Sequence, residues 1–211
     1  MRAAELDELA ACLAAGEVVA VPTDTVYGLA VDPRLPGAVE RLFALKGRPE
    51  QSALPVLIAD PAELDDLAKT PPPAARLAAR YWPGALTMVV SRHSGVLFDL
   101  GGDPTTIGLR CPDNAVLRQL LEITGPLAVT SANRHGEPPC HTADAVRRHL
   151  GTGVSRVLDG GRCDGLPSTV VSLTGGALRC LREGDLSFAE LVAVAGGLPG
   201  VRPMHGAGAA S

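Results

Sequence analysis

Residues 18–29 of the chain read VVAVPTDTVYGL, a short apolar run that passes directly into a polar loop. The apolar run over residues 18–21 predicts a buried strand, and Pro22 ends it because proline cannot donate a backbone hydrogen bond to the sheet. Thr23, Asp24 and Thr25 follow at once. Since α/β folds place their ligand sites at strand ends, this loop is the first candidate site.

Helices and strands alternate on both sides of this stretch. Upstream, Leu6, Leu9 and Leu13 recur at helical spacing, and Gly16 is placed to end that helix. Downstream, the same patterns predict helices over residues 38–45, 64–68, 74–81, 115–123, 143–150 and 188–194, and strands over residues 54–58, 86–90, 106–109, 127–129, 154–158, 169–173 and 178–181.

This alternation predicts one α/β domain over residues 1–195, built on a twisted mixed sheet with flanking helices. Pro55 is expected to place the strand at residues 54–58 on a sheet edge or at a bulge. Residues 196–211 are rich in Gly, Ala and Pro and lack hydrophobic periodicity, so we expect a disordered tail there.

The overall composition is that of a globular protein and narrows the class of partner. Hydrophobic residues make up 46% of the 211 residues, aromatic residues only 3%, and the formal net charge is -4. This balance disfavours nucleic acid as the main ligand, because such binding uses basic surfaces and stacked aromatic side chains. No apolar run approaches the ~18 residues of a membrane span, and the five scattered cysteines form no CxxC pair. We therefore expect a cytoplasmic protein without membrane contact.

Polar clusters recur where the predicted strands and helices end, while the familiar cofactor motifs are missing. Each cluster alone is weak evidence: Lys46 and Arg48 could interact with a helix dipole, and Ser131 and Asn133 could form an ordinary turn. The clusters read PTDTVYGL (residues 22–29), KGRP (46–49), WPGALT (82–87), RCP (110–112), TSAN (130–133), PSTV (167–170) and REG (182–184).

In their order along the chain, PTDTVYGL, KGRP, WPGALT, TSAN and PSTVV resemble the YrdC family of threonylcarbamoyl-adenylate synthases, from about residue 18 to residue 184. The resemblance implies a twisted open α/β sheet around a large concave cavity. It also implies a reaction in which the amine of L-threonine captures bicarbonate to give N-carboxythreonine. The carboxylate of that species attacks the α-phosphorus of ATP and releases pyrophosphate. In this family a separate transferase complex then passes the threonylcarbamoyl group to tRNAs that read ANN codons.

The residue types of the clusters suit that reaction. Each substrate is anionic or carries a carboxylate, so the cavity needs cations and hydroxyl or amide donors. No covalent nucleophile on the protein is required, because the substrate supplies its own. Mg2+ is expected to arrive with ATP and to share the phosphate charge, without a dedicated set of protein ligands.

The motif positions also imply roles for individual residues. Lys46 and Arg48 are expected to hold the triphosphate and to be catalytic, with Gly47 letting the backbone turn so that both face one ligand. The implied threonine site comprises Thr25, Arg110, Ser131 and Ser168, and the implied nucleotide site comprises Lys46, Arg48, Ser52, Thr106, Asn133, His141 and Arg182.

Two positions depart from the family pattern, and two other functions stay open. Leu57 stands where many relatives have His, and His141 stands where Thr is commoner. One alternative function is an RNA-binding or ribosome-associated module without synthase activity, and a weak RNA contact stays open even for a synthase. The other is a carbamoyl-adenylate-forming module, although such modules usually belong to much longer chains.

Overall fold

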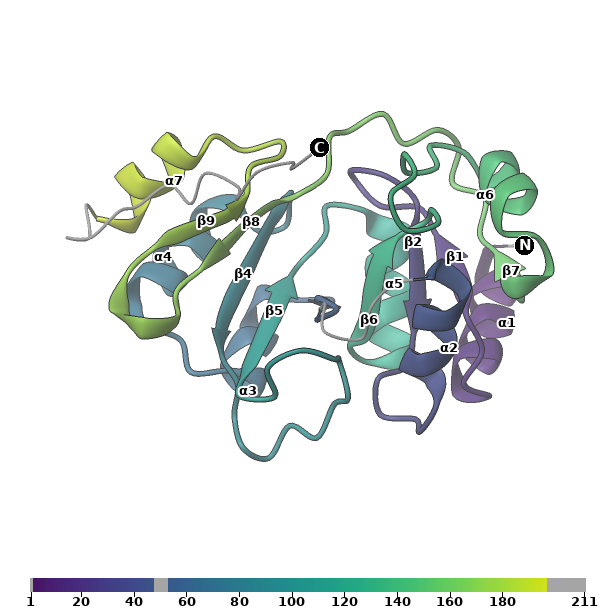
Figure 1. The fold of residues 1–211 in the computed structure, drawn as a ribbon, viewed down its shortest axis with the longest axis horizontal. Helices are drawn as coiled ribbons and strands as arrows, with labels where there is room; N and C mark the ends of the chain where they lie inside the picture. The colour runs from purple at the N-terminus through teal and green to yellow at the C-terminus, as the bar shows by residue number, and fades with distance from the viewer. Residues whose placement is uncertain (1, 48–52, 197–211) are drawn as a thin grey trace, which may run out of the picture.

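The structure is a computed structural model that describes residues 2–47 and 53–196. Within these residues one mixed sheet of nine strands runs in the order β7-β1-β2-β6-β3-β5-β4-β8-β9 (Figure 1). Its strands are β1 (Val19–Val21), β2 (Gly28–Val31), β3 (Val56–Leu57), β4 (Leu86–Ser91), β5 (Thr106–Arg110), β6 (Leu127–Ser131), β7 (Arg156–Val157), β8 (Thr169–Ser172) and β9 (Arg179–Arg182).

Helices flank both faces of the sheet, as the predicted α/β alternation requires. The α-helices are α1 (Arg2–Ala14), α2 (Ala38–Lys46), α3 (Leu64–Leu67), α4 (Pro72–Tyr81), α5 (Ala115–Thr124), α6 (Ala143–Leu150) and α7 (Phe188–Ala195). Short 3-10 helices occupy Pro61–Glu63, Gly151–Gly153 and Thr174–Gly176.

The apolar residues form two buried clusters that correspond to these helical layers. One cluster packs α2, α3, α4, α6 and α7 against the sheet. The other packs α1 and α5 against β1, β2 and β6, through leucines such as Leu9, Leu13 and Leu120. Because aliphatic side chains supply most of both cores, the low aromatic content is no obstacle to folding.

The register of the sheet brings two polar segments together. Val21 of β1 pairs with Gly28 of β2, and Gly28 pairs in turn with Ser131 of β6. The loop between β1 and β2 and the segment after β6 therefore leave the sheet side by side. The Ala132 N–H donates to the Tyr27 carbonyl at 2.7 Å, which ties the two segments together just beyond the sheet.

Strand β2 is not among the predicted strands. Its four residues, Gly-Leu-Ala-Val, follow the polar loop directly and are all buried. A run this short carries little periodicity, and its pairing with β1 and β6 is what makes it a strand. Gly28 suits this place because a Cβ there would lie 2.6 Å from Val129 Cγ1.

The prediction that Pro55 marks a sheet edge or a bulge is wrong. Strand β3 lies in the interior of the sheet, between β6 and β5. Pro55 comes just before the strand, and its carbonyl accepts a hydrogen bond from the Val129 N–H at 2.9 Å. On either side of Pro55, the N–H groups of Leu54 and Ile58 donate to the carbonyl groups of Leu100 and Arg110. Proline therefore removes no bond from the ladder.

The ends of two helices bear on other predictions. Helix α2 ends at Gly47, which adopts φ 62 and so reverses the backbone as expected after Lys46. Helix α7 ends at Gly196, and Arg76 of α4 donates to the carbonyl of Ala195. The predicted tail beyond that point lies outside the described residues. In the part of the chain that is described, no helix is long and apolar enough to cross a bilayer.

Candidate active site

A cavity of about 410 Å³ lies over the middle of the sheet. Alternate residues of adjacent strands form its floor, because side chains two positions apart point to the same face of a strand. The loop after β1 and the segments around Ser131 and Pro167 form its walls. The floor residues are Leu57 of β3, Thr87 and Val89 of β4, Thr106, Gly108 and Arg110 of β5, Val129 and Ser131 of β6, and Val170 of β8.

The loop after β1 is held by its own hydroxyl groups. Thr23 Oγ1 accepts from the N–H groups of Thr25 and Val26 at 3.0 and 3.2 Å and lies 2.6 Å from the Val26 carbonyl, to which it donates. The Thr25 hydroxyl lies 2.9 Å from Thr23 Oγ1. Since Thr23 has already used its proton, Thr25 is the donor of that pair. Thr25 Oγ1 is thereby oriented as an acceptor toward the cavity before any ligand binds.

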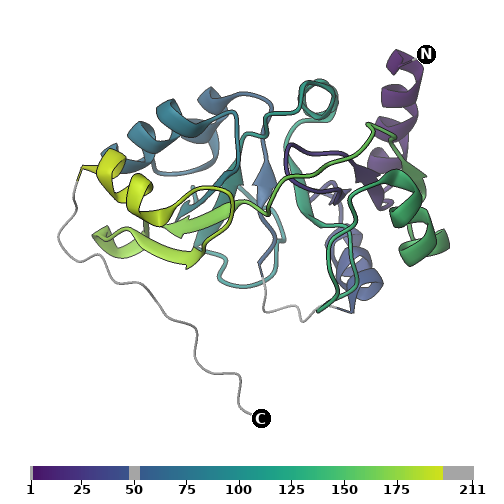
Figure 2. The same ribbon diagram turned by 90° about the horizontal axis from the view of Figure 1, so that it is seen from above.

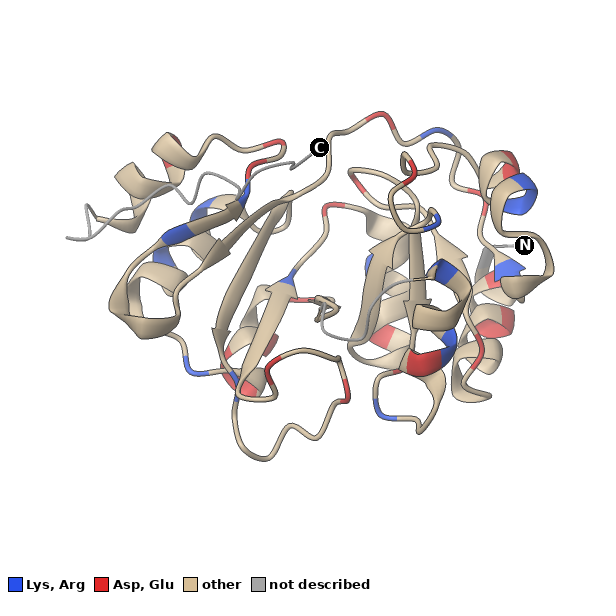
Figure 3. Cartoon of the chain, in the orientation of Figure 1, with Lys and Arg blue, Asp and Glu red and all other residues tan. Residues whose placement is uncertain are grey.

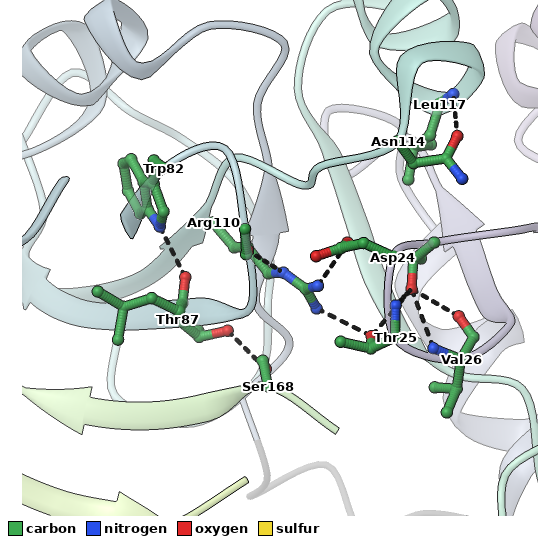
Figure 4. A network of polar contacts seen from close by, with 12 residues as sticks. Asp24, Thr25, Val26, Trp82, Thr87, Arg110, Asn114, Leu117 and Ser168 are labelled. Atoms are coloured by element: carbon green, nitrogen blue, oxygen red, sulfur yellow. Dashed lines mark hydrogen bonds and ion pairs between the residues drawn. The ribbon is translucent and has the colours of Figure 1, made fainter. Parts of the chain in front are cut away.

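Arg110 joins this loop to the opposite side of the cavity (Figure 4). Its Nη2 pairs with Asp24 Oδ1 at 2.6 Å, its Nη1 lies 3.3 Å from Thr25 Oγ1, and its Nε donates to the Gly84 carbonyl at 2.9 Å. Arg110 is only 6% exposed. The guanidinium is thus fixed in one orientation, with two of its five N–H groups outside these three bonds.

Ser168, Thr87 and Arg182 form a second polar group on the cavity. The hydroxyl groups of Thr87 and Ser168 lie 2.9 Å apart (Figure 4). Arg182 Nη2 donates to the Ser168 carbonyl at 2.8 Å and to Ser168 Oγ at 3.1 Å. Partial burial of the Arg182 guanidinium, followed by the positive charge of Arg110, lowers the pKa of Arg182. Two cations that repel each other across a cavity favour an anionic ligand between them.

Lys46 lies behind the wall that the segment around Ser131 forms. Its side chain is 3% exposed, and Nζ donates to the Ser131 carbonyl at 2.5 Å, the Asn133 carbonyl at 2.8 Å and Asn133 Oδ1 at 3.1 Å. Ser131 Oγ also donates to Asn133 Oδ1 at 2.5 Å. Lys46 therefore ties the end of α2 to the Ser131–Asn133 turn, and this turn presents both side chains to the cavity.

The structure brings most of the predicted site residues to one cavity. Those that line it are Thr25, Thr106, Arg110, Ser131, Asn133, Ser168 and Arg182. Lys46 stands behind the wall just described. His141 is not among the lining residues, and its Nδ1 lies 2.6 Å from the Cys163 carbonyl. Arg48 and Ser52 lie outside the described residues. Leu57, which departs from the family pattern, lies on the floor and is 3% exposed.

Among the polar residues of the site that are missing from the predicted set, three make contacts that organise it. Thr23 organises the β1 loop, Asp24 balances the charge of Arg110, and Thr87 orients Ser168. All three belong to motifs quoted above, so their motifs pointed to the region. Their roles depend on partners that are distant in sequence, which no local pattern reveals.

The side chains around the cavity can be compared with the ligands that the expected Mg2+ ion would need. Within residues 2–47 and 53–196, no group of three His, Cys, Asp or Glu side chains is arranged to hold a metal ion. Glu137 lines the cavity, and one of its carboxylate oxygens lies 4.0 Å from His149. A Mg2+ ion that arrived with ATP would therefore take its ligands mainly from phosphate and water, with Glu137 as the lining carboxylate.

Charged residues of both signs lie outside the cavity (Figure 3), and several form ion pairs, such as Arg156 with Glu8. Basic and acidic residues are interspersed on the helices and loops around the sheet, in keeping with the net charge of -4. A broad basic surface is what backbone binding of nucleic acid uses. Arg110 and Arg182 line the cavity, while arginines such as Arg147 and Arg156 form ion pairs on the surface.

Relatives of known name share most of this chain. A protein of Mycobacterium tuberculosis named "Putative threonylcarbamoyl-AMP synthase" is 39% identical over 184 residues, which cover 86% of this chain and 85% of that protein. A "Threonylcarbamoyl-AMP synthase" of Bacillus subtilis is 35% identical over 91% of this chain and 57% of its own length.

Solved structures share the fold. Sua5 of P. abyssi, solved in complex with L-threonine, superimposes with a TM-score of 0.86 at 35% identity. The match covers 94% of this chain, which spans 59% of the length of that protein. YciO of E. coli gives a TM-score of 0.79 at 26% identity, covering 87% of this chain and 90% of its own. Residues 11–184 match the family model Sua5_yciO_yrdC, described as "Telomere recombination", and the chain is therefore a member of the Sua5/YciO/YrdC family.

Proposed function

We propose that this chain is an L-threonylcarbamoyladenylate synthase, which converts L-threonine, bicarbonate and ATP into threonylcarbamoyl-AMP, pyrophosphate and water. The observation that carries the proposal is the oriented Arg110–Thr25 pair in a cavity that also holds Arg182. It is supported by the names of the relatives and by the threonine complex of the archaeal neighbour.

The threonine end of the cavity is built around Arg110. Its guanidinium presents N–H groups that suit the substrate carboxylate, and its orientation is fixed by Asp24 and Gly84. Thr25 Oγ1, held as an acceptor by Thr23, suits the amine or hydroxyl of L-threonine. Ser131 and Ser168 supply further hydroxyl groups on either side.

The nucleotide end is assigned to the cations and amides on the other walls. Arg182 faces the cavity, and Lys46 stands behind Ser131 and Asn133. We assign the triphosphate to Arg48 and Ser52, with Lys46 acting from behind the Ser131–Asn133 turn and Arg182 beside the α-phosphate. The rest of the nucleotide is assigned to Thr106, Asn133 and His141. His141 can join the nucleotide only from beside the cavity, where it now contacts Cys163.

Catalysis in such a site is positioning and charge stabilisation. Arg110 and Thr25 hold threonine so that its carboxylated amine approaches the α-phosphorus, and Arg182 lowers the energy of the charge that develops on the phosphates. The attacking carboxylate belongs to N-carboxythreonine, so no side chain of the protein has to act as a nucleophile. Mg2+, bound with ATP, supplies charge neutralisation on the phosphate oxygens.

The reaction implies partners that act after it. Threonylcarbamoyl-AMP is a mixed anhydride, and a tRNA threonylcarbamoyl-transferase complex is the expected consumer. We place the enzyme in the cytoplasm beside ATP and tRNA. All five cysteines are free thiols, which fits a reducing compartment.

The test is pyrophosphate release by the purified protein, measured with ATP, bicarbonate and each of the twenty amino acids. Synthase activity predicts release with L-threonine that requires bicarbonate and yields threonylcarbamoyl-AMP. Release with carbamoyl phosphate in place of threonine and bicarbonate would point instead to the carbamoyl-adenylate alternative. RNA binding without release under any condition would point to the RNA-binding module.

A further inference from the structure

One connection spans the whole sheet and contacts the threonine end of the cavity. Residues 159–167, here called the strap, link β7 at one edge to β8 beside the opposite edge. Figures 1 and 2 both show this segment crossing from the α6 side of the molecule to β8. The strap ends next to Ser168, whose hydroxyl contacts Thr87.

The first contact between the strap and the β1 loop is made by Tyr27. Its side chain is fully buried, and its hydroxyl donates to the Gly161 carbonyl at 2.7 Å and accepts from the Gly160 N–H at 3.1 Å. A Cβ on Gly160 would lie 2.5 Å from Pro22 Cγ. The strap therefore packs directly on the loop that begins at Pro22.

Gly165 makes the closest approach, directly at the substrate residues. A Cβ on Gly165 would lie 2.7 Å from the Asp24 carbonyl oxygen and 2.8 Å from Thr25 Cα. Both are backbone atoms, so no flexible side chain can move aside. Gly165 does not have the positive φ that only glycine tolerates. Space, and not backbone conformation, is what requires glycine here.

The strap is also held on its far side. The Cys163 N–H donates to the His141 carbonyl at 2.9 Å, and His141 Nδ1 lies 2.6 Å from the Cys163 carbonyl. The Cys140 carbonyl in turn accepts from the Tyr27 N–H at 3.1 Å. Because the strap is tied on both sides, extra volume at Gly165 has to displace the β1 loop.

We propose that Gly165 is a positioning residue for the threonine end of the cavity. Because Gly165 has no Cβ, the strap can pack closely against the β1 loop. In that position Thr25 Oγ1 lies 3.3 Å from Arg110 Nη1, and Asp24 pairs with Arg110 at 2.6 Å. Gly165 itself approaches only Asp24 and Thr25, whereas the assigned nucleotide residue His141 meets the strap through Cys163. The kinetic part of the test rests on the proposed function, and a structural readout is independent of it.

The test compares Gly165→Ala with Gly95→Ala. A Cβ at Gly95 would meet no atom within 4 Å, and Gly95 has an ordinary φ, so it controls for the loss of a glycine. We expect Gly165→Ala to raise the KM for L-threonine about tenfold or more while the KM for ATP changes less than about twofold, since a small misplacement of an aligned group is costly. Gly95→Ala should match the wild type.

Hydrogen exchange gives the readout that needs no activity. The amides of Thr25 and Val26 donate to Thr23 Oγ1, and in Gly165→Ala they should exchange faster than in the wild type while core amides are unchanged. If Gly165→Ala fails to fold, Tyr27→Phe tests the seating of the strap on the β1 loop by removing only the hydroxyl bonds to Gly160 and Gly161. It should shift the same readouts in the same direction by a smaller amount, and unchanged readouts would overturn the proposal.

The outcomes separate the two proposals. A folded Gly165→Ala protein with unchanged exchange and an unchanged threonine KM would overturn the role of Gly165. An equal rise in both KM values would also overturn it, because a general loss of structure does not distinguish the two ends of the cavity. A wild-type protein that releases no pyrophosphate with L-threonine would overturn the proposed function, and the exchange experiment would still decide the role of Gly165.

Discussion

The two arginines of the cavity differ in how their charge is balanced. Arg110 is buried and paired with Asp24 at 2.6 Å, and two further bonds fix its orientation. Arg182, on β9, is exposed as a residue but has a partly buried guanidinium, which bonds to the neutral oxygens of Ser168. Among the described residues, no carboxylate forms an ion pair with Arg182.

This difference indicates what each arginine can contribute to ligand binding. A guanidinium whose charge is balanced by a carboxylate, as in Arg110, adds little net charge to the site. Because its orientation is fixed, it can select a small ligand by the directions of its hydrogen bonds. An uncompensated guanidinium, whose pKa is lowered by burial and by Arg110, contributes charge and gains most from a polyanion. This division matches the proposed substrates, an amino acid beside Arg110 and a nucleoside triphosphate beside Arg182.

The largest effect is expected from Lys46→Ala. Removing Nζ leaves the carbonyl groups of Ser131 and Asn133 without their buried donor, which costs roughly 1–3 kcal/mol of stability for each unsatisfied group. Pyrophosphate release should fall by about 10² or more, because the wall that carries Ser131 and Asn133 loses both its charge and its support. Lys69→Ala, which removes an exposed lysine, is the control.

Urea unfolding and pyrophosphate release on the same samples check this prediction. Lys46→Arg should also be impaired, because a planar guanidinium cannot replace a compact ammonium among three acceptors. A fully active and stable Lys46→Ala protein would remove Lys46 from the site.

The next largest effect is expected at Arg182, the arginine without a carboxylate partner among the described residues. Arg182→Gln should raise the KM for ATP and lower kcat/KM by up to about 10², because a cation facing the phosphates acts most strongly in the transition state. The KM for L-threonine should change little. Arg179→Gln on the same strand is the matched control, since Arg179 is exposed and its side chain donates to Thr174, away from Ser168. Equal effects of the two substitutions would contradict the assignment.

An effect of similar size, but on the other substrate, is expected at Arg110. Arg110→Lys keeps the charge but loses the fork that reaches Asp24, Thr25 and Gly84 together. Losing one charge-assisted hydrogen bond costs ~1.5–3 kcal/mol, so the KM for L-threonine should rise about tenfold to more than a hundredfold. The KM for ATP is the internal control. An unchanged threonine KM would show that the geometry of Arg110 is not what recognises the substrate.

The smallest effect lies outside the comparison, at Cys111, which directly follows β5. Burial raises the pKa of the Cys111 thiol from 9.0 to about 11. A raised pKa means that the neutral thiol stabilises the folded state fully below pH 9.0 and that this contribution is lost as pH rises toward about 11. We expect Tm to fall over that interval, and to fall less steeply in Cys111→Ala. Parallel Tm curves for the two proteins would refute this prediction.

Local pattern is enough to predict much of the fold. Strand β1, helices α2, α4, α5 and α6, and strands β4 to β6 follow from short-range periodicity and from stop signals such as Pro22 and Gly47. Strand β2 escapes prediction because four residues carry too little pattern. Strand β3 is misplaced because the rule for proline concerns residues that donate to the ladder, and Pro55 lies just outside it.

The sequence by itself determined several of the chemical groups that the protein brings to its site, because the motifs place Arg110, Ser131 and Ser168 at strand ends and Thr25 in the loop after β1. The tertiary structure alone decided how these groups are paired. Thr25 and Arg110 are 85 residues apart, and Thr87 and Ser168 are 81 apart, so only sheet register and the strap bring them together. The physical reason is that strand formation depends on neighbours in sequence, whereas compensation of a buried charge depends on whatever group the fold places within hydrogen-bond distance.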